Sequence, residues 1–194
     1  MKIAAVILAA GSSSRFGQPK ALLEWQGETL LQRNCRIAKE SGHDPILVVT
    51  SPSCQYDIPD YAQKLSNPDH ERGMGTSLGL AAVSLTKLEV DALMVLFPDQ
   101  PAISSKTLGA IHSAFSPPEI TIVIADSGEH SGPPVLFSSQ HFSALSKLTG
   151  DQGGKQIVQN FSNQTRFVFI PEARWDIDTP EIWQKFLQEN GHSS

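Results

Sequence analysis

The chain has 194 residues, of which 40% are hydrophobic and 18% charged, a composition that is ordinary for a soluble globular protein with a substantial core. Its formal net charge of -5 excludes a broad basic surface for nucleic acid, so any phosphate site must be a local basic spot on an acidic protein. The first apolar run ends at Gly11, is too short to span a membrane and lacks a signal-peptide cleavage region, so we expect a cytoplasmic protein.

Strands and helices are predicted to alternate along the chain. Apolar runs rich in β-branched residues, typical of strands covered on both faces, predict strands at residues 3–8, 46–49, 92–97, 120–124 and 167–170. Helical patterns occupy residues 30–38, 77–85 and 108–115, and a last helix follows Thr179, a predicted N-cap, with Pro180 and Glu181 in its first turn. Two segments, residues 51–68 and 127–151, look like insertions or lids. The pattern predicts a three-layer α/β/α sandwich with a Rossmann-like, mostly parallel mixed sheet, in one domain spanning residues 1–194.

Ligands of such sheets collect at the carboxyl ends of the strands. We therefore expect the loop at Gly11, the turn at Pro98 and Asp99, and the turn near Asp126 to share one edge.

The loop after the first strand is predicted to bind a polyphosphate. It runs through Leu8, Ala9, Ala10, Gly11, Ser12, Ser13, Ser14 and Arg15 to Lys20. Backbone N–H groups of such a loop can surround an anion, and two cationic side chains add full charges. The spacing matches neither a Walker A motif nor a dinucleotide fingerprint. A surface turn with two solvated cations is the alternative.

Acidic residues near two predicted strand ends are candidate metal ligands. Asp99 is flanked by prolines that stiffen its turn, and Mg²⁺ prefers one or two carboxylates together with phosphate oxygens. Asp176 and Asp178 would face opposite ways in an extended chain, so we expect one to point at the site and the other to stay in solvent. The alternative is helix capping, by Asp99 near Ser104 and by Asp178 or Thr179 at the last helix.

Glycine-rich segments give further candidates. After Asn67, the run Gly73, Gly75 and Ser77 opens a helix and could admit a base or ribose, or form a tight turn with a cap. The loop with Gly150, Asp151 and Lys155 could meet a second substrate, or serve as a turn. Gly132, Pro133 and Pro134 indicate a rigid hairpin or lid edge without a chemical group. Cys35 and Cys54 form no zinc pattern, and reduced thiols are expected.

Together these motifs resemble a known family over residues 1 to about 190. The first loop resembles the signature of nucleotidyltransferases that activate sugars, polyols and pterins. The later motifs, at Asp99–Pro101, Gly132–Pro134, Gly150–Asp151 and Asp178–Glu181, resemble one branch, the molybdenum cofactor nucleotidyltransferases. Leu-Ala-Ala-Gly is similar to the cytidylyl-transferring members, whereas guanylyl-transferring relatives tend to carry Leu-Ala-Gly-Gly. Phe16, Lys155 and Ile182 depart from the common pattern, and Lys155 lacks the planar fork of the usual arginine.

This resemblance implies transfer of CMP from CTP to molybdopterin, with release of pyrophosphate and with Mg²⁺, or Mn²⁺ in its place, as cofactor. Lys20, Arg15 and Asp99 would be catalytic, and Asp99 and Asp178 would hold the metal. The implied nucleotide-binding residues are Leu8, Ala9, Ala10, Gly11, Ser12, Ser13, Ser14, Lys20, Asn67, Gly73, Gly75, Ser77 and Pro98. The implied acceptor-binding residues are Gly132, Pro133, Gly150, Asp151 and Lys155. A molybdoenzyme or its chaperone is the implied partner, and neither nucleic acid nor a membrane is expected.

Three other interpretations compete with this one. The same chemistry could use GTP, or a sugar or polyol phosphate as acceptor. A non-catalytic carrier could bind the nucleotide or cofactor, although simple binding does not need two metal ligands. A Rossmann-type oxidoreductase is disfavoured, because no acidic residue follows the first loop where a second strand would contact the ribose.

Overall fold

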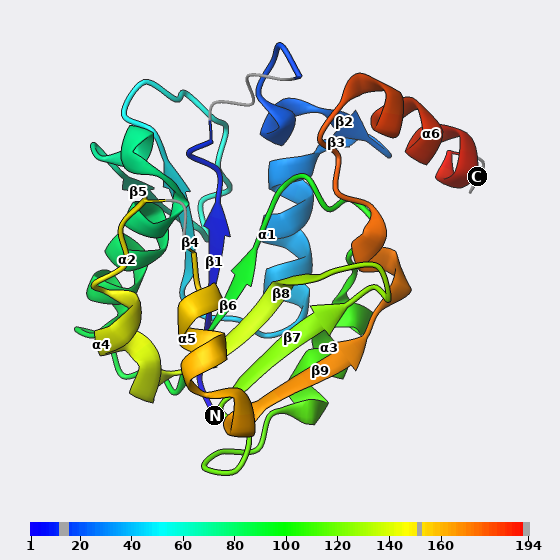
Figure 1. Ribbon diagram of the computed structural model, residues 1–194. Helices are drawn as coiled ribbons and strands as arrows, with labels where there is room; N and C mark the ends of the chain where they lie inside the picture. The colour runs from blue at the N-terminus through cyan, green and yellow to red at the C-terminus, as the bar shows by residue number, and fades with distance from the viewer. Residues whose placement is uncertain (12–15, 151–152, 192–194) are drawn as a thin grey trace.

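The computed structural model describes residues 1–11, 16–150 and 153–191 (Figure 1). Within these ranges, seven strands form one sheet in the order β5-β4-β1-β6-β8-β7-β9. These strands are β1 (Ile3–Leu8), β4 (Ile46–Thr50), β5 (Gln63–Ser66), β6 (Ala92–Leu96), β7 (Ile122–Asp126), β8 (Ser131–Ser138) and β9 (Thr165–Phe169). Neighbours pair in parallel except β8, which runs antiparallel to both β6 and β7. The predicted mostly parallel mixed sheet is confirmed.

Helices cover both faces of this sheet, as the three-layer prediction requires. The α-helices are α1 (Leu30–Glu40), α2 (Met74–Leu85), α3 (Ser105–Ala114), α4 (Phe142–Leu145), α5 (Lys155–Asn160) and α6 (Pro180–Asn190). Helices α1 and α3 bury residues such as Leu31 and Leu108 against one face, whereas α2, α4 and α5 bury residues such as Leu78 and Phe142 against the other. Short 3₁₀ turns are η1 (Lys20–Leu22), η2 (His70–Arg72), η3 (Ser139–His141), η5 (Ser162–Gln164) and η6 (Pro171–Arg174).

Hydroxyl side chains cap the N-termini of three of the helices. The Thr29 hydroxyl accepts a hydrogen bond from the N–H of Gln32 at the start of α1. Ser104 does the same for Thr107 at α3, and Thr179 for Ile182 at α6, where Pro180 occupies the first turn. The predicted N-cap of the last helix is confirmed, and each cap satisfies a backbone donor that the helix leaves unpaired.

Both segments that were predicted as insertions or lids contain a strand of the sheet, so those parts of them belong to the core of the fold. Residues 51–68 include β5, which pairs in parallel with β4, and residues 127–151 include β8 near the middle of the sheet. Pro133 and Pro134 fit within β8 because the pairing with β7 shifts there: Ile124 faces Val135, but Ala125 faces Gly132. A bulge of this kind leaves the prolines outside the regular ladder, which needs N–H donors. Gly132–Pro134 therefore belongs to the hairpin that β7 and β8 form, as the hairpin interpretation expected.

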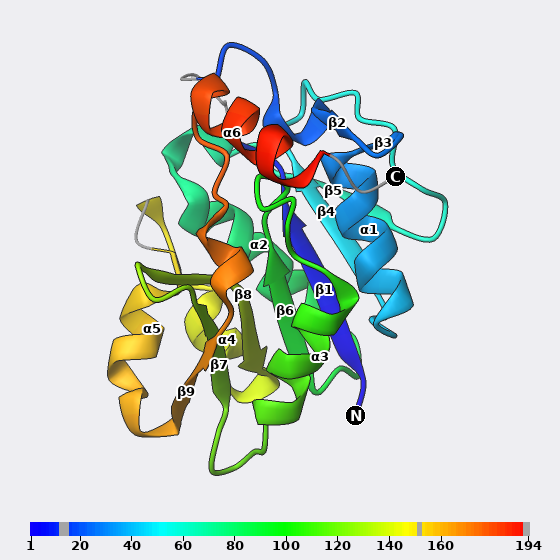
Figure 2. The ribbon, with the colours of Figure 1, turned by 90° about the vertical axis from the view of Figure 1, so that its right-hand side faces the viewer.

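The C-terminal helix lies at the end of the sheet where β1 ends (Figures 1 and 2), and an aromatic cluster fixes it there. A hairpin of β2 (Glu24–Trp25) and β3 (Glu28–Thr29) turns through Gln26 and Gly27, both with positive φ, and presents Trp25 to α6. The ring of Phe186 lies 4.8 Å from that of Trp25, 5.4 Å from Trp175 and 5.6 Å from Trp183. This packing holds the chain between η6 and α6 over the carboxyl ends of the strands.

No helix in the described ranges is both long and apolar enough to cross a membrane. Cys35 is buried, Cys54 is half-buried, and both are free thiols.

Candidate active site at the carboxyl edge of the sheet

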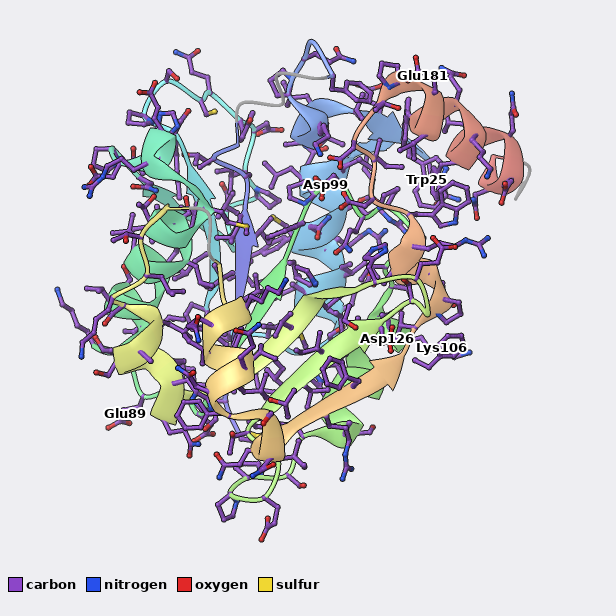
Figure 3. All side chains as sticks on the ribbon, in the orientation of Figure 1. Trp25, Glu89, Asp99, Lys106, Asp126 and Glu181 are labelled. Carbon is purple, nitrogen blue, oxygen red and sulfur yellow. The ribbon has the colours of Figure 1, made fainter. Side chains whose placement is uncertain are left out.

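Asp99 lies at the centre of this edge (Figure 3). It follows β6 through Phe97 and Pro98, and most of its side chain is buried, with 17% of the side-chain surface exposed. Ser104 provides the N-cap of α3, and Thr179 provides that of α6. The alternative of a cap by Asp178 or Thr179 therefore holds for Thr179, and neither Asp99 nor Asp178 caps the helix that follows it.

The segment between η6 and α6 brings two more carboxylates to Asp99. The N–H of Ile177 donates to the backbone carbonyl of Asp99 at 2.9 Å, which fixes the two segments together. Asp176 N–H bonds the carbonyl of Arg174, and Asp178 N–H bonds that of Asp176, each at 3.0 Å. These tight turns curl the chain, so Asp176 and Asp178 both offer an oxygen to a group in which the ligand atoms of Asp99, Asp176 and Asp178 lie within 4.8 Å of one another. Asp178 stays half-exposed to solvent, as expected for one of the pair, but its oxygen also reaches the group because the tight turns curl the segment.

Lys20 reaches this cluster from the end of the first loop. Its Nζ lies 2.6 Å from Oδ2 of Asp99 and 2.9 Å from Oδ1 of Asp178. Burial by itself lowers the pKa of the ammonium, but the charge of Asp99 and the hydrogen bonds to both carboxylates raise it above its ordinary value. Lys20 therefore remains protonated throughout the physiological range.

Burial disfavours the ionised forms of two of the carboxylates, those of Asp99 and Asp176. Burial raises the pKa of Asp99 despite the opposing charge of Lys20, and burial raises the pKa of Asp176 to about 6, with Asp99 and Asp178 adding to the effect. Oδ1 of Asp99 and Oδ1 of Asp176 are buried and have no hydrogen-bond partner among the residues that the structure describes. Three carboxylates converge here beside the ammonium of Lys20, and oxygen ligands of this kind suit a hard divalent cation.

A contact of the neighbouring Gln100 connects the turn after β6 to β8. The amide nitrogen of Gln100 donates to the backbone carbonyl of Pro133 at 2.9 Å, and Gln100 is only 5% exposed. Gly132 and Pro133, predicted as acceptor-binding, therefore lie at the same edge as the carboxylates.

Asn67 and the start of α2 form a separate hydrogen-bonded group. The Asn67 amide donates to Oγ1 of Thr76 and to Oγ of Ser77, each at 2.9 Å, and its carbonyl oxygen accepts from the N–H of Asp69. These bonds give Asn67 and Ser77 a structural role at the helix start, and their contact with a nucleotide stays a prediction.

The predicted acceptor residues do not all lie together. A Cβ on Gly75 would come within 2.8 Å of the carbonyl oxygen of Gly150, so Gly75 allows α2 to approach the loop at residues 149–150. Gly150 thus lies against α2, as does Gly73, which precedes it with a φ of 108°. Lys155 is exposed at the start of α5.

The first loop is described only at its beginning and end. Leu8 ends β1, Ala9 donates its N–H to the carbonyl of Val49 at 2.8 Å, Ala10 is 8% exposed, and Gly11 is exposed. The predicted phosphate contacts of Ser12, Ser13, Ser14 and Arg15, and the acceptor contact of Asp151, lie outside the described residues.

The sequence pattern predicted no separate role for two polar residues at this edge, Asp176 and Gln100. Asp176 was expected only as one of an interchangeable pair, and its burial follows from the tight turns that the sequence pattern does not reveal. Gln100 belongs to the Asp99–Pro101 motif. Its amide finds a partner, the carbonyl of Pro133, because β8 lies beside this turn in the fold.

Residues 5–166 match the family model described as MobA-like NTP transferase domain. The chain is 31% identical over 192 residues to a protein of Bacillus subtilis strain 168 named purine catabolism protein PucB, with 91% of each chain covered. It is 27% identical over 194 residues to the molybdenum cofactor guanylyltransferase of Xanthomonas euvesicatoria pv. vesicatoria strain 85-10, covering 95% of this chain and 94% of the relative.

Solved structures share the same fold. The crystal structure of Rv0371c from Mycobacterium tuberculosis H37Rv superposes with a TM-score of 0.80 at 25% identity, covering 97% of this chain and 98% of that one. The manganese complex of Rv0371C superposes with a TM-score of 0.76 at 22% identity and the same coverage.

Proposed function

The chain belongs to the family of MobA-like NTP transferase domains and is a nucleotidyltransferase, and we propose that it transfers CMP from CTP to the phosphate of a molybdopterin-type acceptor. The observation that carries this proposal is the convergence of Asp99, Asp176 and Asp178 with the ammonium of Lys20 at the carboxyl edge of the sheet. Such edges are where open α/β sheets bind their ligands.

The cluster suits this reaction, which must bring two anions together and stabilise an anionic leaving group. An oxygen of the acceptor phosphate attacks the α-phosphorus of the nucleotide, and the bond to the β-phosphate breaks with release of pyrophosphate. The attacking phosphate is already an oxyanion at neutral pH, so no strong general base is needed. What is needed is positive charge that holds two anions together and stabilises the leaving group.

Residues of this chain can supply part of that positive charge and can bind a cation that supplies the rest. Asp99, Asp176 and Asp178 would bind a divalent cation, which when bound neutralises phosphate oxygens; Mg²⁺ is the proposed ion, with Mn²⁺ as a substitute. Asp176 is added here to the pair inferred from the sequence, because its buried oxygen lacks a partner in the described chain. Lys20 keeps its proton and would contact the α-phosphate, while Arg15 and the loop from Gly11 to Ser14 would hold the β- and γ-phosphates.

The choice of CTP rests on Ala10. This residue is buried in the first loop, just after β1, and the resemblance to cytidylyl-transferring members implies that its methyl group leaves less room for a base than glycine would. A smaller pyrimidine fits such a pocket better than a purine.

GTP is the second candidate donor. The relative from Xanthomonas euvesicatoria carries the name molybdenum cofactor guanylyltransferase, which supports both the pterin acceptor and the guanine nucleotide. The relative from Bacillus subtilis is named for purine catabolism, and that name specifies neither donor nor acceptor.

One experiment tests donor and acceptor together. The purified protein is incubated with each of the four nucleoside triphosphates, Mg²⁺ or Mn²⁺, and molybdopterin, and the product masses and pyrophosphate are measured. We expect a product that carries CMP, with pyrophosphate formed only when the acceptor is present. A GMP product would establish the second candidate. Absence of any nucleotidyl product with molybdopterin, but turnover with sugar or polyol phosphates, would replace the acceptor, and absence of turnover with all of them would overturn the proposal.

A further inference from the structure

Two histidines meet where α1 and α3 pack side by side on one face of the sheet (Figure 2). His43 follows the end of α1, and His112 lies in the last turn of α3. Nε2 of one ring lies 3.1 Å from Nε2 of the other. The chain after His43 enters β4, and the N–H of Asp44 donates to the carbonyl of Ile3 at the start of β1. The pair therefore lies at the amino edge of the sheet, at the end away from Asp99.

The ring of His43 is fixed both in position and in tautomer. Its backbone N–H and its Nδ1–H both donate to the carbonyl of Ala38, at 3.1 Å and 3.0 Å. Because a carbonyl can only accept, Nδ1 keeps the proton and Nε2 carries a lone pair, which faces His112. Metal-binding histidines are held in the same way: one ring nitrogen donates to a carbonyl or a carboxylate, and the other binds the ion. His43 thus already has the outer contact that orients a metal ligand.

The spacing of the two rings matches chelation of one ion. Two imidazole nitrogens that bind one zinc ion at about 2.0–2.1 Å, with a tetrahedral angle between the bonds, lie about 3.3 Å apart, close to the 3.1 Å observed. A straight N–H···N hydrogen bond of this length would separate the ring centres by about 5.4 Å, the N···N distance plus one ring radius for each ring. Chelation at the same N···N distance would separate them by about 4.8 Å. The observed separation is 4.9 Å.

The two rings offer neutral nitrogen to such an ion. Burial lowers the pKa of both imidazoles, to about 4 for His43, so neither ring is charged near pH 7. Neutral imidazole suits Zn²⁺, Cu²⁺ and Ni²⁺, whereas Mg²⁺ prefers oxygen. An ion on Nε2 of the half-buried His112 requires the proton of that ring on Nδ1, a change of tautomer that leaves the ring neutral. In the described ranges, three candidate ligand residues come together only at Asp99, Asp176 and Asp178, so water would complete the coordination at the histidines.

We propose that His43 and His112 form a second metal site, which binds one transition-metal ion such as Zn²⁺ and joins the end of α1 to α3. The site is separate in place and in chemistry from the carboxylate cluster, because it lies at the opposite edge of the sheet and offers nitrogen instead of oxygen. The inference goes beyond the proposed function and does not depend on it. An ion that binds the folded arrangement of the two rings stabilises that arrangement by mass action.

Zinc binding to the full chain is measured by calorimetry in excess Mg²⁺, which competes for the carboxylate cluster. His43→Asn and His112→Asn each remove one proposed ligand, and His70→Asn makes the same change at a half-buried histidine of η2. We expect one equivalent of Zn²⁺ to bind the parent and His70→Asn at the proposed site. Each ligand variant should bind it at least about 10–100-fold more weakly, because losing only an outer partner of a metal ligand already costs that much affinity.

Cu²⁺ gives a readout that identifies the binding atoms. Its electron paramagnetic resonance spectrum should show splitting from two imidazole nitrogens in the parent and from one in His112→Asn. Because His43→Asn removes a buried ring, denaturant unfolding is also measured with and without Zn²⁺, which should raise the midpoint of the parent and of His70→Asn but of neither ligand variant. Equal Zn²⁺ affinity in the parent and His112→Asn, a Cu²⁺ spectrum without nitrogen splitting, or saturation only above about 1 mM Zn²⁺ would overturn the inference.

Discussion

Lys20 Nζ lies 2.6 Å from Oδ2 of Asp99, although 79 positions separate the two residues in the chain. The same ammonium lies 2.9 Å from Asp178, so it occupies the space between two of the proposed metal ligands. A divalent cation bound to these oxygens would repel an ammonium at this distance. Lys20 and the metal therefore compete for Asp99, and metal binding would release Lys20 toward the substrate phosphates.

Lys20→Ala tests both the catalytic role of Lys20 and its competition with the metal for Asp99. Turnover is expected to fall by about 10²–10³-fold, the usual cost of removing a preorganised donor to the transition state. Mn²⁺ affinity of the protein without nucleotide should rise, because the competing ammonium is gone, and this can be measured by the loss of the free Mn²⁺ signal in electron paramagnetic resonance. Lys106→Ala, at an exposed position on α3, is the control. Near-normal turnover would refute the catalytic role, and weaker Mn²⁺ binding would refute the competition.

Asp99→Asn and Asp176→Asn should both weaken metal binding, because a neutral amide is a poorer ligand than a carboxylate. The concentration of Mg²⁺ needed for half-maximal activity is expected to increase by at least about tenfold in each. Asp126→Asn is the control, since Asp126 ends β7 outside the carboxylate group. An unchanged metal titration in Asp176→Asn would restrict the site to the pair inferred from the sequence.

Ala10→Gly should relax the preference for CTP over GTP, because removing a buried methyl group enlarges the space beside the first loop. The ratio of kcat/KM for the two nucleotides measures this directly. One methyl group in a pocket changes such a ratio by about 10–200-fold, so the effect is large enough to detect. An unchanged ratio would mean that Ala10 does not contact the base and that donor choice is determined elsewhere.

The sequence predicted this fold well where local pattern and topology agree. Buried runs such as residues 3–8 and 92–97 became central strands, and Thr179 began the last helix as expected. At residues 131–138 it indicated a hairpin at Gly132–Pro134 but not the strand β8, because glycine and proline are turn residues in most contexts and only the bulge opposite Ile124 makes them compatible with a strand.

The candidate site was predicted in its chemistry but not in its geometry. Asp99 and Lys20 could be recognised from their motifs, and the structure brings them together. The convergence of Asp176 depends on two tight turns and on the aromatic packing of α6, and both are tertiary features without a local signal.

Gly75→Ala and Gly109→Ala form a matched pair for the packing of α2. A Cβ on Gly75 would meet the backbone oxygen of Gly150 at 2.8 Å, which backbone atoms cannot relieve cheaply, whereas a Cβ on Gly109 of α3 meets nothing within 4 Å. We expect the first change to lower the free energy of unfolding by about 1–3 kcal/mol and the second to raise it by up to about 1 kcal/mol. Denaturant unfolding measures both, and a neutral Gly75→Ala would show that α2 does not depend on this close approach.

His43 should make the protein sensitive to acid. It is 1% exposed; its Nδ1–H donates to the carbonyl of Ala38 at 3.0 Å, and its Nε2 lies 3.1 Å from Nε2 of His112, which donates when both rings are neutral. Burial lowers the pKa of His43 from 6.5 to about 4, so between these values the unfolded chain binds more protons than the folded one. Stability is therefore fully present above about pH 6.5 and falls as the pH drops toward 4, by about 3 kcal/mol. His43→Asn keeps a donor for Ala38 but cannot titrate, so its free energy of unfolding should change less between pH 7 and 4.5. Equal slopes in parent and variant would assign the acid sensitivity to other groups.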